Sequence, residues 1–175
     1  MGCYYKMKDL LLKVLFVAIF IFVVGFIIVS NHNASKTVVV IEGNFDKKPL
    51  EIVLGQYQDS DCGMTIDDIT YASQVIAPNG KTWFFHDHGG MINWLKDKSF
   101  KDDVVIWVHT KDTNKWIDGY MAYYSVNEVT PMKYGFGAYE NNQDKLIDFN
   151  EMKERMLRGE NMTNPVYAKY IQENN

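Results

Sequence analysis

Residues 71–85, YASQVIAPNGKTWFF, read as two strands joined by a tight turn. The turn is Pro78-Asn79-Gly80, because an Asn-Gly pair between β-branched and aromatic residues is a strong hairpin signal. We predict strands over 71–77 and 81–85, a helix over 91–98 and a further strand over 104–109. This part of the chain therefore reads strand, strand, helix, strand.

The signals on either side of this region are weaker. A β-branched run predicts a strand at 37–41, and alternating aromatic and smaller residues predict one strand or two bent ones over 116–126. Beyond residue 141, one-sided apolar spacing predicts a helix that ends at Gly159, and a short final helix follows at 165–171. The apolar face, with a methionine stripe that we assign to the core, consists of Leu146, Phe149, Met152, Met156 and Leu157.

An apolar run near the N-terminus predicts a membrane span. From residue 10 to residue 29 the only charge is Lys13, and this length is close to that needed to cross the hydrocarbon core. Lys6, Lys8 and Lys13 lie on its N-terminal side, which places the N-terminus in the cytoplasm and the rest of the chain outside. We expect an uncleaved transmembrane anchor within 1–30, a tether over 31–36 and one exported domain over 37–175. A cleaved signal peptide is the alternative.

Composition limits the partners of the protein. The formal net charge is −4, and the sequence holds no basic patch of the kind that nucleic acids require. We therefore expect no nucleic-acid partner. The sequence leaves the oligomeric state open, with a homodimer as one option.

The triplet Cys62-Gly63-Met64 places two soft sulfur atoms close together. Thiolate and thioether ligands favour Cu(I) over hard cations, and a glycine between them lets the backbone turn tightly enough for both to face one ion. The chain has one other cysteine, Cys3, which the predicted span would leave on the opposite side of the membrane. An exported thiol without a partner favours a ligand role, although one Cys near one Met is more often a packing arrangement.

A second group of candidate ligands follows the predicted hairpin. His86, His88 and Met91 fall where a strand gives way to a helix, so their side chains could converge. The alternatives are a core role for Met91 and an ordinary polar junction for the His-Asp-His sequence.

Four segments together resemble the NosL family, accessory proteins of nitrous oxide reductase maturation. Their order and spacing match over residues 56–157, and the Thr-Pro-Met-x-Tyr-Gly element is the most specific. The segments are Cys62-Gly63-Met64, Phe85 through Met91 with Trp94-Leu95, Trp116-Ile117-Asp118 with Ala122-Tyr123-Tyr124, and Thr130-Pro131-Met132-Lys133-Tyr134-Gly135.

The resemblance implies an α+β fold of two related ββαβ-type units that form an antiparallel sheet with packed helices. It also implies a Cu(I) metallochaperone, not an enzyme, anchored in the inner membrane with its soluble domain in the periplasm. Its partners would be nitrous oxide reductase, whose copper-sulfide centre it would supply, and the membrane maturation complex of that enzyme. Carried over by residue, the metal ligands are Cys62, Met64 and Met91, with Met132 as a helper.

The sequence departs from the family pattern at several positions. Many members have cysteines where this chain has Asp59 and Gly90, so an all-cysteine site is excluded. His86 and His88 replace an acidic and an aliphatic residue, and we therefore add His88 as an optional nitrogen ligand. Familiar members are lipoproteins, whereas this chain is expected to use a transmembrane helix.

Two other functions stay open on the sequence alone. One is an exported thiol enzyme, similar to an organomercurial lyase, with Cys62 as nucleophile and His86 or His88 as base. Mercurial chemistry needs more than one thiolate, which argues against it. The other is an anchored interaction domain in which Cys62 is buried and inert.

Overall fold

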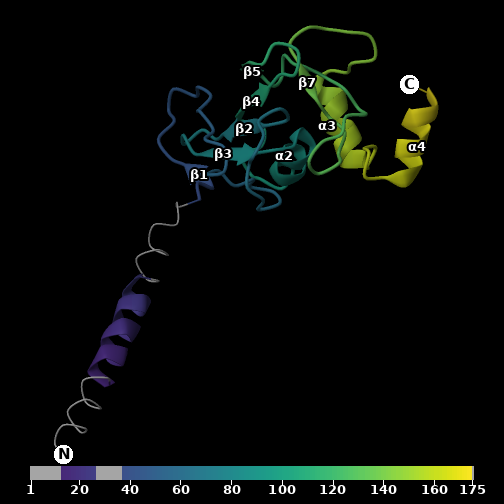
Figure 1. Ribbon diagram of the computed structural model, residues 1–175. Coiled ribbons are helices and arrows are strands. Elements are labelled where there is room, and N and C mark those ends of the chain that lie inside the picture. The colour runs from purple at the N-terminus through teal and green to yellow at the C-terminus, as the bar shows by residue number, and fades with distance from the viewer. Residues whose placement is uncertain (1–12, 27–36, 175) are drawn as a thin grey trace, which may run out of the picture. The chain divides into compact units, whose positions relative to one another are not determined.

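The computed structural model describes residues 13–26 and 37–174, which belong to two separate units of the chain, Met1–Lys36 and Thr37–Asn175 (Figure 1). The second unit contains an antiparallel sheet of five strands in the order β1-β3-β2-β4-β5. The strands are β1 Val40–Ile41, β2 Ser73–Ile76, β3 Thr82–Phe85, β4 Val105–His109 and β5 Trp116–Asp118.

The predicted hairpin of β2 and β3 is confirmed. Val75 pairs with Trp83 across the two strands, and the turn is closed by the bond from the Gly80 amide to the Ala77 carbonyl at 2.9 Å. Gly80 has a φ of 80°, a conformation that side chains disfavour. The local turn chemistry thus sets the register of the sheet centre.

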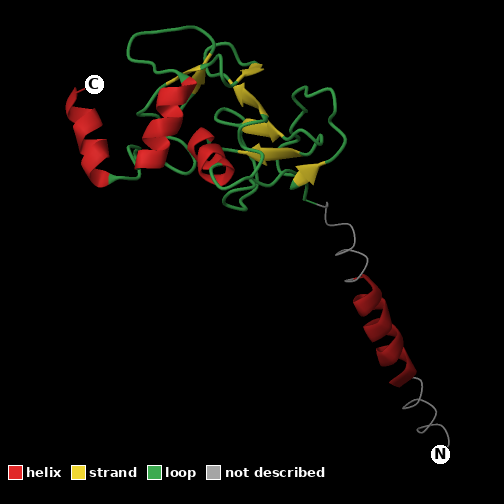
Figure 2. Cartoon of the chain, turned by 180° about the vertical axis from the view of Figure 1, so that it is seen from behind, coloured by secondary structure: helices red, strands yellow, loops and turns green. Residues whose placement is uncertain are grey.

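The helices of this unit gather on one side of the sheet (Figures 1 and 2). Helix α2 (His88–Leu95) and helix α3 (Phe149–Arg158) pack over a core that includes Val75, Phe85 and Ile106. The opposite face is covered by loops, with a smaller cluster of Ile52, Tyr57, Ile66, Ala72 and Phe84. Adjacent residues such as Phe84 and Phe85 enter different clusters, because successive strand residues point to opposite faces.

The predicted C-terminal helix is confirmed, with a shorter apolar face than expected. Asp148 caps the N-terminus of α3 by accepting from the Glu151 amide, and Gly159 ends the helix with a φ of 73°. Met152 and Met156 are buried, as predicted, whereas Leu157 is exposed and Leu146 precedes the helix. A final helix, α4, covers Pro165–Asn174.

The prediction of a second ββαβ unit is wrong. After β5, strands β6 (Tyr123–Tyr124) and β7 (Ala138–Tyr139) form a separate two-stranded sheet, and between α3 and residue 174 the described chain adds no strand. The segment before β7 contains Pro131, which lacks an amide hydrogen, and Gly135 with a φ of 93°. Both features work against a regular strand there.

The predicted transmembrane helix and the inner-membrane location are also wrong. Within the described ranges 13–26 and 37–174, no helix is both long enough and apolar enough to cross a bilayer. The N-terminal helix is described over residues 13–26. The other residues of the predicted span, the tether over 31–36 and Cys3 lie outside the described residues.

Candidate metal-binding site

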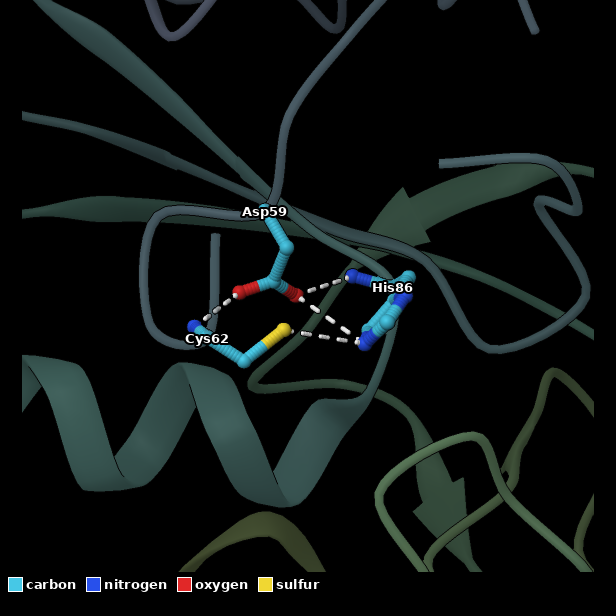
Figure 3. Close-up of side chains that lie close together, drawn as sticks. All are labelled: Asp59, Cys62 and His86. Carbon is cyan, nitrogen blue, oxygen red and sulfur yellow. Dashed lines mark hydrogen bonds and ion pairs between the residues drawn. The ribbon is translucent and has the colours of Figure 1, made fainter. Parts of the chain in front are cut away.

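Three potential ligands converge at the end of strand β3. Asp59, Cys62 and His86 each offer one donor atom, and these atoms lie within 4.8 Å of one another. The Cys62 Sγ lies 3.4 Å from the Nε2 atom of His86, and the same nitrogen lies 3.7 Å from Oδ2 of Asp59. Figure 3 shows the sulfur and the imidazole facing one another beside the carboxylate.

The carboxylate of Asp59 holds the cysteine loop in place. Its Oδ1 atom accepts from the Asp61 amide at 2.7 Å and from the Cys62 amide at 3.0 Å. The backbone of Asp59 adds bonds from its amide to the Met64 carbonyl and from the Gly63 amide to its own carbonyl. Gly63 has a φ of 76°, a conformation that favours a residue without Cβ in this tight turn.

The same carboxylate joins this loop to the end of β3. The Oδ2 atom of Asp59 accepts from the His86 amide at 2.7 Å, and the Ser60 amide donates to the Phe84 carbonyl at 2.9 Å. Asp59 is 2% exposed, and its carboxylate therefore connects the two segments without competition from water. Cys62 and His86, which are 24 positions apart in the sequence, are brought together by this connection.

A second aspartate fixes the position at which the chain turns into α2. Asp87 is buried and accepts from the Gly89 amide at 2.9 Å as the N-cap of the helix. Its other oxygen accepts from the Met132 amide at 2.9 Å. The residue after His86 therefore attaches both the helix and the 130–135 loop to the site.

The surroundings of Cys62 favour the neutral thiol when no cation is bound. Burial raises the pKa of Cys62, a hydrogen bond from the Met64 amide lowers it, and the negative charge of Asp59 raises it again. Burial also raises the pKa of Asp61, against a hydrogen bond from Asn93. A metal ion would reverse the effect on Cys62, because a nearby cation stabilises the thiolate.

The structure places the predicted sulfur and nitrogen ligands in different surroundings. Met64 follows the cysteine turn and is 45% exposed, whereas Met91 belongs to α2 and is fully buried in the core. His88 is fully buried, and its Nδ1 atom forms a 2.7 Å hydrogen bond with Ser73 Oγ. Met132 is half-buried. Of the predicted candidates, the structure thus joins Cys62 with His86, and metal binding by the others stays a prediction.

Asp59 is the group that the ligand prediction missed. A signal was present, since an aspartate commonly accepts from amides two and three residues ahead, here those of Asp61 and Cys62. The expectation that Cys62 needs a partner because it is exported relied on the membrane span.

Comparisons with known protein families and with curated proteins find no match. The resemblance to the NosL family therefore depends on the four sequence segments alone.

Proposed function

We propose that this protein binds Cu(I) through Cys62 and His86 and transfers the ion to an acceptor, as a metallochaperone and not as an enzyme. The observation that supports the proposal best is the 3.4 Å approach of the Cys62 Sγ and the His86 Nε2 in a partly enclosed site. A thiolate and an imidazole suit Cu(I), whose affinity for soft donors is high.

The hydrogen bonds that Asp59 already accepts favour a metal site with two ligands. Its two oxygens already accept three backbone amides, from Asp61, Cys62 and His86. A carboxylate offers about four lone-pair positions, so little acceptor capacity is left for a metal. Cys62 and His86 remain as the donors, and the open coordination positions let the ligands of an acceptor enter before these two leave.

The same geometry argues against a thiol enzyme. In a catalytic triad, the acid orients the imidazole through the nitrogen opposite the nucleophile. Here Asp59 and Cys62 both approach Nε2 of His86, so the carboxylate is not placed to orient the imidazole for proton transfer. The raised pKa of Cys62 also reduces the fraction of nucleophilic thiolate.

The identity of the acceptor follows from the sequence resemblance. NosL-like proteins serve the copper-sulfide centre of nitrous oxide reductase, and we propose that enzyme and its maturation complex as the destination of the copper. The Cys62-Gly63-Met64 and Thr130-Pro131-Met132 segments support this assignment.

A competition titration with a chromophoric Cu(I) chelator tests the proposal. The full chain should bind one equivalent of Cu(I), with binding lost in Cys62→Ser and weakened by roughly tenfold or more in His86→Asn, because each variant removes one of the two donors. Met121→Leu is the matched control, since Met121 is 73% exposed and lies outside the site.

Two results would contradict the proposal. One is wild-type Cu(I) affinity in Cys62→Ser. The other is a Zn(II) affinity above that for Cu(I), which would assign a zinc site. X-ray absorption on the Cu(I)-loaded chain should show one sulfur and one nitrogen, and additional sulfur ligands would implicate Met64 or Met91.

A further inference from the structure

A cavity of about 170 Å³ lies between helices α2 and α3, and none of the three residues of the metal-binding cluster lines it. Its floor is apolar and comes from both helices, with Ile92 and Leu95 on α2 and Phe149 on α3, and the exposed Leu157 of α3 lies at its edge. An engineered cavity of about 150 Å³ in another protein accepts benzene, so this space suits one small ring.

One wall of the cavity is aromatic. Tyr120 lies in the connection between β5 and β6, and its ring meets that of Phe149 edge to face with the centroids 4.6 Å apart. Because Tyr120 is 44% exposed, the aromatic wall that it forms lies at the mouth of the cavity. A ring entering the cavity could add a further edge-to-face contact, a geometry that aromatic pairs prefer.

The rim of the cavity is positively charged. Lys96, Lys101 and Lys153 line it together with a single acidic residue, Asp102, although the whole chain carries a net charge of −4. The Lys96 ammonium donates to the Asn93 side chain at 2.8 Å, and that of Lys101 to the Lys96 carbonyl at 3.3 Å. In the described part of the chain, none of these lysines forms a direct ion pair with a carboxylate.

We propose that this cavity binds a small aromatic carboxylate. The ring occupies the apolar floor between Ile92 and Phe149, and the carboxylate reaches the lysine rim, where Lys153 lies on α3 one helical turn from Phe149. Charge-assisted hydrogen bonds to an ammonium are stronger than neutral ones, which gives the acid an advantage over an uncharged ligand of the same shape. This site is independent of the proposed copper binding.

The test is an NMR titration of the full-length, 15N-labelled chain with phenylacetate and, as a neutral isostere, phenylacetamide. A ligand of this size should bind phenylacetate with a Kd of roughly 1–10 mM. The amide shifts should concentrate on Ile92, Leu95, Tyr120 and Lys153. Phenylacetamide should bind roughly fivefold or more weakly, because it lacks the charge.

Two variants test the contributions of the apolar lining and the lysine rim separately. Lys153→Gln should lower the affinity for phenylacetate by roughly fivefold and leave the affinity for phenylacetamide unchanged, since the substitution removes only a positive charge. Leu157→Trp should block both ligands, because Leu157 is 44% exposed at the cavity and a larger side chain can fill the space without entering the core. Lys48→Gln is the matched control, since Lys48 does not line the cavity.

Three results would overturn the proposal. Equal affinities for the acid and the amide would show that the lysine rim contributes nothing. Undiminished binding in Leu157→Trp, or shifts scattered over residues outside the cavity, would place the ligand elsewhere. An absence of saturation at tens of millimolar phenylacetate would show that the cavity is not a binding site.

Discussion

The substitution Asp59→Asn should destabilise the protein by about 3 kcal/mol. An asparagine can keep one oxygen where Oδ1 accepts from the amides of Asp61 and Cys62, but its NH2 group then faces the His86 amide. One charge-assisted bond, worth about 1.5–3 kcal/mol, is lost, and two others become weaker neutral bonds. Because Asp59 is 2% exposed, water cannot easily replace the lost bond.

Urea unfolding followed by tryptophan fluorescence measures this loss. The midpoint should fall with an unchanged denaturant slope, since the surface exposed on unfolding stays the same. Asp46→Asn is the matched control, because the Asp46 side chain is 81% exposed and forms only a 3.8 Å surface ion pair with Lys48. A loss below about 0.5 kcal/mol in Asp59→Asn would refute the role of this carboxylate as the link between the loop and β3.

Three further predictions follow from other contacts. Gly89→Ala should destabilise the chain by about 1–3 kcal/mol in thermal unfolding, because the new Cβ would lie 2.4 Å from that of Tyr134; Gly25→Ala, with nothing within 4 Å, is the control, and equal melting temperatures for the two would contradict this. Iodoacetamide should modify metal-free Cys62 with an apparent pKa above that of a free thiol, because burial and Asp59 disfavour the thiolate, and faster modification than a model thiol at neutral pH would favour an activated nucleophile instead. Burial lowers the pKa of His88 from 6.5 to about 3, so between these pH values the unfolded chain binds a proton at this residue and the folded chain does not. The free energy of unfolding should therefore fall by on the order of 4 kcal/mol as the pH drops from 6.5 towards 3. The same pH dependence in His88→Asn as in wild type would contradict this assignment.

The parts of the fold that were predicted correctly depend on local chemistry. Two such points are the hairpin turn at Gly80 and the end of α3 at Gly159. Each requires a positive φ, which side chains disfavour, and each has a glycine at that position. At these points the contacts join residues that are close together in the sequence. Their sequence signals could therefore be interpreted without knowledge of the tertiary structure.

The pairing at the site depends on tertiary contacts that sequence spacing does not reveal. Met64 is two residues from Cys62 but 45% exposed, whereas the Nε2 atom of His86, 24 residues away, lies 3.4 Å from the Cys62 Sγ. His86 and His88 looked equivalent in the sequence. Asp87 begins the helix between them, so His86 stays at the strand end beside Cys62 and His88 enters the core beside Ser73.

The errors in the predicted architecture have different causes. The apolar composition of residues 10–29 was taken as sufficient for a membrane span, whereas none of the helices within residues 13–26 and 37–174 is long and apolar enough for one. The repeat of the ββαβ unit was inferred from a family resemblance and not from local signals. The strands expected over 116–126 divided between two sheets instead.

If Cys62 and His86 hold Cu(I) as proposed, their separation along the chain would make the ion a removable cross-link. An ion held by both residues closes a loop of 24 positions, which in a chain-entropy treatment of covalent cross-links corresponds to about 3 kcal/mol. The loaded protein should therefore resist unfolding and proteolysis more than the empty protein. Transfer of the copper ion would leave a less stable, metal-free protein. A protease would then degrade this metal-free form faster than the loaded form.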